Sequence, residues 1–198
     1  MQKLADTTVH ICGVGALGSN LAVNLARTGI GRLVLIDRDR VEESNIGTQV
    51  YSLADVGGRK AEILRNSLYR EVGLEADAIV QDLVERNVAK ILKGAQIVVD
   101  TFDNSTSRRL VSEFCRSHST ACLHAGVNDG YGEVVWNDSY RVPSDEGLDV
   151  CDYPLARNLI SLVSTVASES LIRYIATGAK EGYSVTVGDL AINLETDT

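Results

Sequence analysis

The stretch Val9-His-Ile-Cys-Gly-Val-Gly-Ala-Leu-Gly-Ser-Asn20 decides the fold. A short apolar run is followed by Gly13, Gly15 and Gly18, and then by apolar residues at helical spacing. This order predicts a strand, a tight glycine turn and the N-terminus of a helix. Backbone N–H groups and the positive end of the helix dipole meet at such a turn and favour a bound phosphate. Many nucleotide-binding domains carry a turn of this kind, so its meaning depends on the motifs that come later in the chain.

Strands alternate with helices over the first two-thirds of the chain. The predicted strands are residues 8–12, 33–37, 76–80, 97–101 and 121–125. The predicted helices are residues 16–27, 58–71, 84–92 and 105–116. This alternation predicts a parallel sheet with right-handed crossovers.

The last third follows a different pattern. Residues 131–136 predict a strand in antiparallel surroundings, and residues 184–187 and 190–194 predict a hairpin. Residues 155–176 predict a long helix whose apolar positions cover more than one face, so we expect it in the core or in an oligomer contact. The expected fold class is α/β. It is a Rossmann-like, mostly parallel sheet flanked by helices, with antiparallel strands and a long helix in the C-terminal third.

Composition excludes several classes of function. The chain has 198 residues, of which 44% are hydrophobic and 23% charged, as in a folded domain. Its net charge of −8 argues against a nucleic-acid surface. We see no signal peptide before the first strand and no apolar run long enough to span a bilayer. We therefore expect a cytoplasmic protein that binds neither nucleic acid nor a membrane, with reduced thiols.

A second cluster begins at Asp37, which ends the second predicted strand. A nucleotide-binding fold places a carboxylate there for the ribose hydroxyls, although a carboxylate that only caps the loop is the alternative. Ser44, Asn45 and Gln49 follow as neutral donors and acceptors that suit a phosphate chain and its metal. Lys60 can place a point charge on phosphate oxygens, the alternative being a solvated helix lysine.

A third cluster follows the predicted strand 97–101. Asp100 ends that strand and Asp103 lies just beyond it, at the edge where parallel strands line a ligand crevice. Asp103 is placed to hold Mg²⁺, which takes one or two carboxylates together with substrate phosphates. Alternatively, Asp103 is the N-cap of the helix that begins at Ser105.

Together these motifs resemble the ThiF/MoeB/HesA family, the adenylating domain of enzymes that activate ubiquitin-like proteins and sulfur carriers. The matching motifs are G-V-G-A-L-G at 13–18, D-R-D-R-V-E-E-S-N at 37–45, Gln49, G-G-R-K-A at 57–61 and D-T-F-D-N-S-T-S-R at 100–108. The resemblance covers residues 9–135 well. It implies one adenylation domain over residues 1–198, with a nucleotide-binding half of about residues 1–126.

The resemblance implies an ATP site rather than a dinucleotide site. Lys60 stabilises the phosphates, and Asp103 is the essential carboxylate and positions Mg²⁺ through ATP. The implied nucleotide-binding residues are Gly13, Gly15, Ala16, Gly18, Asp37, Asp39, Ser44, Asn45, Gln49, Lys60, Asp103 and Asn104. The implied reaction is attack of a protein C-terminal carboxylate on the α-phosphate of ATP, giving an acyl-adenylate and pyrophosphate. The implied partners are a small ubiquitin-like or sulfur-carrier protein ending in Gly-Gly and a second copy of the chain in a homodimer.

Three departures from the family pattern stand out. The family usually has an arginine before Gln49 that contacts the phosphates, and here that residue is Thr48. Family members commonly carry an N-terminal helix with an arginine. Here Lys3 is the one basic residue before the first predicted strand. Arg38, Arg40 or Arg59 could replace these charges. The family's C-terminal C-x-x-C pairs are missing, so we expect no structural zinc.

Cys151 is a further candidate, because some family members use a cysteine to receive the activated carboxyl as a thioester. Asp149 and Asp152 flank it, however, and nearby anions disfavour a thiolate. Packing of the loop is the alternative explanation for this cysteine.

Three other functions stay open. One is an ATP-using enzyme whose substrate is a tRNA-base carboxylate or a peptide terminus, and the negative net charge disfavours tRNA. The chain could be a non-catalytic partner subunit of a heteromeric activating enzyme, or an NAD- or FAD-dependent oxidoreductase. His124 follows a strand near the expected crevice and could touch a substrate, but for all three histidines (His10, His118 and His124) we favour a structural or surface role.

Overall fold

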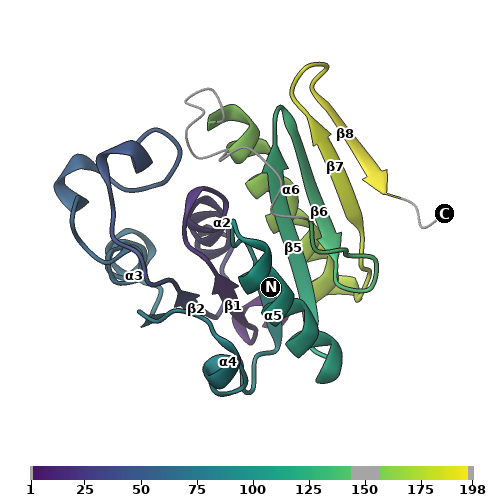
Figure 1. Ribbon diagram of the computed structural model, residues 1–198, viewed down its shortest axis with the longest axis horizontal. Helices are drawn as coiled ribbons and strands as arrows, with labels where there is room; N and C mark the ends of the chain where they lie inside the picture. Colours follow the sequence, from purple (N-terminus) through teal and green to yellow (C-terminus); the bar gives the residue numbers. More distant parts are fainter. Residues whose placement is uncertain (1, 144–156, 196–198) are drawn as a thin grey trace.

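A single eight-stranded sheet organises the molecule (Figure 1). The computed structural model describes residues 2–143 and 157–195. The strand order is β3-β2-β1-β4-β5-β6-β7-β8. The parallel strands are β1 (Thr8–Cys12), β2 (Arg32–Ile36), β3 (Ala76–Ile79), β4 (Ile97–Asp100) and β5 (Ala121–Asn128). The antiparallel strands are β6 (Tyr131–Trp136), β7 (Gly182–Thr186) and β8 (Ala191–Glu195). The expected fold class is confirmed.

Helices cover both faces of the parallel part of this sheet. They are α2 (Ala16–Arg27), α3 (Lys60–Val72), α4 (Glu85–Ile91), α5 (Ser105–Ser117) and α6 (Arg157–Thr177). Successive side chains of a strand point to opposite faces. Ile11 therefore packs with α2, α3 and α6, whereas Cys12 packs with α4 and α5. Because both faces are buried, the central strands contain continuous apolar runs at residues 33–36 and 97–99 rather than alternating patterns.

Helix α6 is the longest helix and lies against α2 and strands β5, β6 and β7. Its buried residues include Leu159, Val163 and Leu171. By length and composition it is apolar enough to cross a membrane, so the expectation that no run reaches that length was wrong. Half of the apolar window is buried inside the protein, which explains why its apolar positions spread over more than one face.

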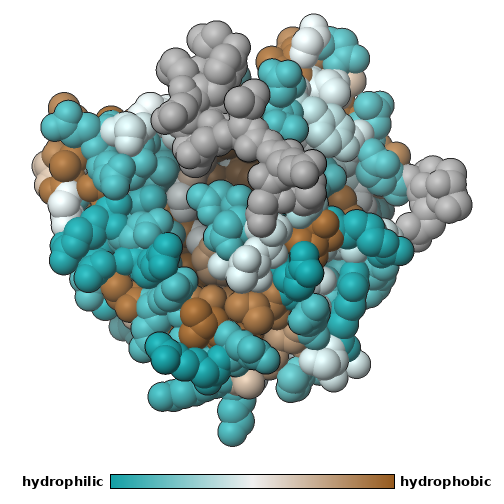
Figure 2. All heavy atoms as spheres, viewed as in Figure 1, coloured by the Kyte–Doolittle hydropathy of each residue, from teal (hydrophilic) through white to brown (hydrophobic). Residues whose placement is uncertain are grey.

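The surface in Figure 2, viewed as in Figure 1, is predominantly hydrophilic and is interrupted by separate hydrophobic groups. Strands β7 and β8 form the right-hand edge of the view in Figure 1, and α3 lies at the left.

Strand order places three loops at one edge of the sheet. Cys12 is in register with Ile36 of β2 and with Asp100 of β4. The residues after these strands therefore leave the sheet side by side. The crossovers run in opposite directions on the two sides of the β1–β4 pair, and this switch point is where open α/β sheets bind ligands.

Some boundaries differ from those predicted. The helix expected from residue 58 begins at Lys60, because Gly57 has a φ of +85° and the carbonyl of Gly58 accepts the N–H of Val41. The long loop before it contains two short 3-10 turns, η1 (Glu43–Asn45) and η2 (Leu53–Asp55). A short helix α1 (Gln2–Ala5) also precedes β1.

Gly18 is required by the close approach of α2 to the glycine turn. A Cβ at Gly18 would collide with the carbonyl of Gly13 and lie 2.6 Å from the Thr101 hydroxyl oxygen. A Cβ at Gly15 would meet no atom within 4 Å. The turn is therefore packed on its inner side and open on the side of Gly15.

We predict that Gly18→Ala lowers the free energy of unfolding by about 1–3 kcal/mol, because backbone atoms must shift to admit the methyl group. Gly15→Ala is the matched control and should cost less than about 1 kcal/mol, as expected at a helix N-cap. Urea unfolding of both variants measures the difference. Equal losses would contradict the packing described for the turn.

Candidate functional site

The glycine turn is held from both sides by hydrogen bonds. The N–H of Gly13, whose φ is +88°, donates to the carbonyl of Ile36 at 2.8 Å. The hydroxyl of Thr101 donates to the carbonyl of Gly13 at 2.8 Å. The turn is thus joined to the ends of β2 and β4, while the first N–H groups of α2 are left for an external acceptor.

Asp37 links the glycine turn to the loop after β2. Its Oδ2 accepts the N–H of Val14 at 2.8 Å, and its Oδ1 accepts the N–H of Asp39 at 2.7 Å. Burial raises the pKa of Asp37 above its ordinary value, although these two N–H groups and the Lys60 ammonium act in the opposite direction. Each oxygen keeps a lone pair for another donor.

The loop between β2 and α3 brings the second cluster to the same edge. Asn45 closes η1, because its Oδ1 accepts the N–H of Glu42 at 2.9 Å, and its carbonyl accepts the N–H of Gln49. Ser44 is exposed beside it. Gln49 is buried, and its Oε1 has no hydrogen-bond partner in the described structure. A ligand hydroxyl, amino group or metal-bound water could satisfy that oxygen.

Lys60 is buried at the first position of α3. Its Nζ lies 3.9 Å from Oδ2 of Asp39, and no shorter polar contact of this ammonium occurs among the described residues. The interpretation of Lys60 as a solvated helix lysine was therefore wrong. A buried ammonium with a distant counter-ion is suited to an incoming anion.

Tyr51 was not predicted as a site residue. Its buried hydroxyl donates to the carbonyl of Val14 at 2.8 Å and lies 3.4 Å from the carbonyl of Lys60. Burial raises the pKa of Tyr51, which keeps the hydroxyl a donor. Tyr51 thus fixes the glycine turn relative to the start of α3, and nothing in its local sequence indicates this role.

The loop after β4 presents Asp103 to solvent at this edge. Asn104, not Asp103, is the N-cap of α5, because its Oδ1 accepts the N–H of Ser107 at 2.9 Å. The capping alternative for Asp103 was therefore wrong. The carboxylate of Asp103 contacts the Asn104 amide at 3.3 Å and is available to a cation.

A buried polar network holds this loop from behind. Oδ1 of Asp100 accepts the N–H of Phe102 at 3.1 Å, and Nε of Arg108 donates to the Phe102 carbonyl at 2.6 Å. His124 lies 2.8 Å from Asp100 through Nδ1 and stacks on Tyr140 at 3.6 Å. His124 is 1% exposed, so it has the structural role that we favoured.

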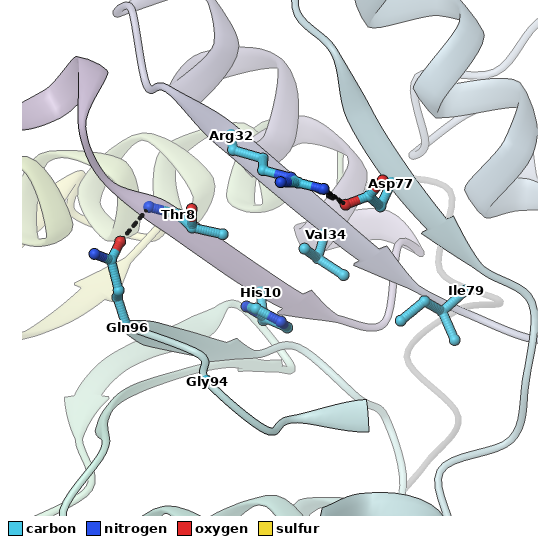
Figure 3. Close-up of a pocket in the computed structure, with 8 residues that line it drawn as sticks. All are labelled: Thr8, His10, Arg32, Val34, Asp77, Ile79, Gly94 and Gln96. Atoms are coloured by element: carbon cyan, nitrogen blue, oxygen red, sulfur yellow. Dashed lines mark hydrogen bonds and ion pairs between the residues drawn. The ribbon is translucent and has the colours of Figure 1, made fainter. Parts of the chain in front are cut away.

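The other two histidines lie away from the glycine turn. His118 stacks on Phe114 at the end of α5. His10 is buried with an unpartnered Nδ1 beside a hollow of about 570 Å³ (Figure 3). That hollow lies beside the first residues of β1 and β2, whereas the glycine turn follows the opposite end of β1.

The arginines proposed as replacement charges have other partners. Arg38 binds Asp82 at 2.9 Å, Arg40 donates to the carbonyl of Gly57, and Arg59 donates to the carbonyl of Arg38. Cys151 lies outside the described residues. Cys12, Cys115 and Cys122 are free and buried.

These residues come from segments far apart in the sequence and lie at the same edge of the sheet. Backbone N–H groups, the Lys60 ammonium and the Asp103 carboxylate can bind an anion together with a divalent cation. Comparison with known families matches residues 1–182 to the ThiF family.

The chain belongs to the ThiF family. The resemblance drawn from the three clusters is thus confirmed, and it extends beyond residue 135.

Two similar proteins agree with this assignment. The chain is 34% identical over 138 residues to the SAMP-activating enzyme E1 of Haloferax volcanii, covering 67% of this chain and 50% of that protein. It is 28% identical over 155 residues to the sulfur carrier protein ThiS adenylyltransferase of Escherichia coli, covering 77% of this chain and 61% of that protein. The chain thus spans between half and about three-fifths of these relatives' lengths.

A solved structure shows the same fold. The crystal structure of E. coli MccB with ATP superposes with a TM-score of 0.81 at 20% identity, over 98% of this chain and 65% of that one. At this identity the likeness concerns the fold alone.

We predict that Tyr51→Phe lowers the free energy of unfolding by about 1–2 kcal/mol, because the buried carbonyl of Val14 loses its donor. Tyr69→Phe is the control, since Tyr69 is 61% exposed on α3 and should change stability by less than about 0.5 kcal/mol. Urea unfolding tests both variants. An unchanged Tyr51→Phe protein would contradict the role of this hydroxyl.

A second prediction concerns the pH dependence of stability. The pKa of Asp37 is raised above its ordinary 3.8. The contribution of Asp37 to the free energy of unfolding is therefore greatest at low pH and is lost as the pH rises through its folded-state pKa. The unfolding free energy of the wild type minus that of Asp37→Asn should therefore fall as the pH increases from 3.8. Asp129→Asn, in an exposed turn, is measured alongside as the control. A difference that rises with pH would contradict the raised pKa.

Proposed function

We propose that this chain transfers AMP from MgATP to the C-terminal carboxylate of a small ubiquitin-like or sulfur-carrier protein. The observation that carries the proposal is the placement of three segments at the open glycine turn. Asp37 accepts the N–H of Val14, Lys60 lies 3.9 Å from Asp39, and Asp103 follows the loop in which Thr101 donates to the carbonyl of Gly13. The names of the relatives support it, since one activates SAMP and another adenylates ThiS. The shared fold with MccB, whose crystal structure contains ATP, is compatible with the same nucleotide.

The residues present fit a nucleoside triphosphate. Asp37 has lone pairs for the ribose hydroxyls in addition to the backbone N–H groups that it already binds. The open side of the turn at Gly15 leaves room beside the first N–H groups of α2 for phosphate oxygens. The ammonium of Lys60, whose ion-pair partner Asp39 is 3.9 Å away, and the unpartnered amide oxygen of Gln49 complete the set of groups available to a ligand.

Asp103 is the residue that we assign to Mg²⁺. Among the described residues, no group of three or more His, Cys, Asp or Glu side chains could hold a metal ion. Mg²⁺ commonly binds through one or two carboxylates plus phosphate oxygens and water, so an exposed single carboxylate suffices. When bound, the ion neutralises phosphate charge.

The reaction requires two anions to meet. A carboxylate oxygen of the carrier forms a bond to the α-phosphorus, while the bond from that phosphorus to the bridging β-oxygen breaks. The products are the acyl-adenylate and pyrophosphate. Because a carboxylate is a weak nucleophile, positioning and the positive charge of Lys60 have to lower the barrier.

We predict that Asp103→Ala and Lys60→Ala each reduce ATP–pyrophosphate exchange by at least about 100-fold, the loss expected when an electrostatic contact in the transition state is removed. The assay uses sulfur carrier protein ThiS as the carrier. Glu113→Ala and Lys90→Ala are the controls, because both residues are exposed on helices and should leave the exchange unchanged.

Calorimetry separates the competing functions. Wild-type protein should bind MgATP and not NAD. MgATP binding without exchange with any carrier ending in Gly-Gly would favour a non-catalytic partner subunit. Binding of NAD without ATP would overturn the proposal in favour of an oxidoreductase.

A further inference from the structure

The candidate site has few cations for the charge that it must bind. Carboxylates of Asp37, Asp39 and Asp103 lie along this edge of the sheet, and the Lys60 ammonium lies 3.9 Å from Oδ2 of Asp39. A triphosphate adds several negative charges to this region. A second cation would therefore reduce repulsion within the site.

Arg157 lies close to the glycine turn in space, although it is distant in sequence. It is the first residue of α6, and its Nη1 donates to the carbonyl of Thr48 at 3.1 Å and to Oδ1 of Asn20 at 3.0 Å. The amide of Asn20 in turn donates to the carbonyl of Ala16 at 2.7 Å. Two hydrogen bonds thus connect the guanidinium to the first turn of α2.

The position of Arg157 is fixed by the packing of its helix. Helix α6 lies along α2, and the hydroxyl of Ser164, two turns after Arg157, donates to the carbonyl of Leu17 at 3.3 Å. The amide of Asn20 also donates to the carbonyl of Thr48 at 2.9 Å. Arg157, Asn20 and Thr48 therefore form a closed set of contacts beside the turn.

The guanidinium keeps donors that it does not use in these contacts. Arginine has five N–H donors in a planar fork. Within the described part of the chain, only Nη1 of Arg157 has partners. Among the described residues, Arg40 and Arg59 also use only Nη1, but their partners are the carbonyls of Gly57 and Arg38, so these contacts do not connect them to the first turn of α2.

We propose that Arg157 is a phosphate-binding residue that supplies the second positive charge for the nucleotide. Nη1 anchors the side chain on Thr48 and Asn20, and the remaining N–H groups bind phosphate oxygens. The inference rests on the proposed function, since it assumes a triphosphate at the glycine turn. Thr48 is neutral, but in this proposal its backbone carbonyl orients the side chain of Arg157 from α6.

Calorimetry with MgATP and with adenosine tests this role. Arg157→Ala should weaken MgATP binding by about tenfold or more and leave adenosine binding unchanged, because adenosine carries no phosphate. Arg157→Lys should keep part of the affinity, since it retains the charge but not the fork. Arg173→Ala is the control, because this arginine lies on the same helix and pairs with Glu169 and Glu181 instead. Thermal unfolding reports whether each variant is folded.

A double variant provides an independent test. The backbone carbonyl of Thr48 contacts the guanidinium of Arg157. An arginine introduced at position 48 therefore has its backbone next to the position of that guanidinium. Thr48→Arg combined with Arg157→Ala should therefore recover MgATP affinity. Recovery would support a charge contribution over a structural one.

The outcomes separate this inference from the proposed function. Folded Arg157→Ala protein with wild-type MgATP affinity would overturn the role of Arg157 alone. Equal losses for MgATP and adenosine would also overturn it, because they would indicate a structural role. Failure of the wild type to bind MgATP would overturn both proposals.

Discussion

The carboxylate of Asp37 is the contact on which the geometry of the site depends. It joins the glycine turn after β1 to the loop after β2 through the N–H groups of Val14 and Asp39. Burial makes its ionised form costly and so raises its pKa. The two backbone donors and Lys60 offset part of that cost. The ribose-binding carboxylate of the proposal is thus also the connection that holds the turn in place.

The loop that carries Asp103 depends on a different set of contacts. Asp100 and Arg108 bind the N–H and the carbonyl of Phe102, and His124 and Tyr140 pack behind them. This network is buried, so its polar groups are satisfied internally rather than by water. Asp103 itself is exposed one residue beyond the anchored backbone. A rigid support beneath an exposed carboxylate is the arrangement expected of a group that binds a cation.

Much of this could be predicted from the sequence, because local patterns reflect local structure. The glycine turn and the alternation of strands and helices correctly predicted the fold. The acidic residues at strand ends lie at the edge of the sheet that we propose as the site. Lys60 was also identified, although the helix that it begins was expected two residues earlier. Hydrogen bonds of Gly57 and Gly58 with the backbone of Val41 explain that difference.

The contacts between distant segments could not be predicted. Tyr51 reaches the carbonyl of Val14, and Arg157 reaches Asn20 across 137 residues of sequence. Neither side chain belongs to a motif, and each role exists only once α3 and α6 have packed. In the sequence, Thr48 stands where the family usually has an arginine, which suggested a missing positive charge. In the fold, Arg157 binds the backbone carbonyl of Thr48.

The most direct test of the account is a crystal structure with Mg²⁺ and an ATP analogue that cannot be cleaved between the α- and β-phosphates. The account predicts the ribose at Asp37, the phosphates between the first turn of α2 and Lys60, and the metal ion at Asp103. A nucleotide bound away from this edge of the sheet, for example in the hollow beside His10, would contradict it.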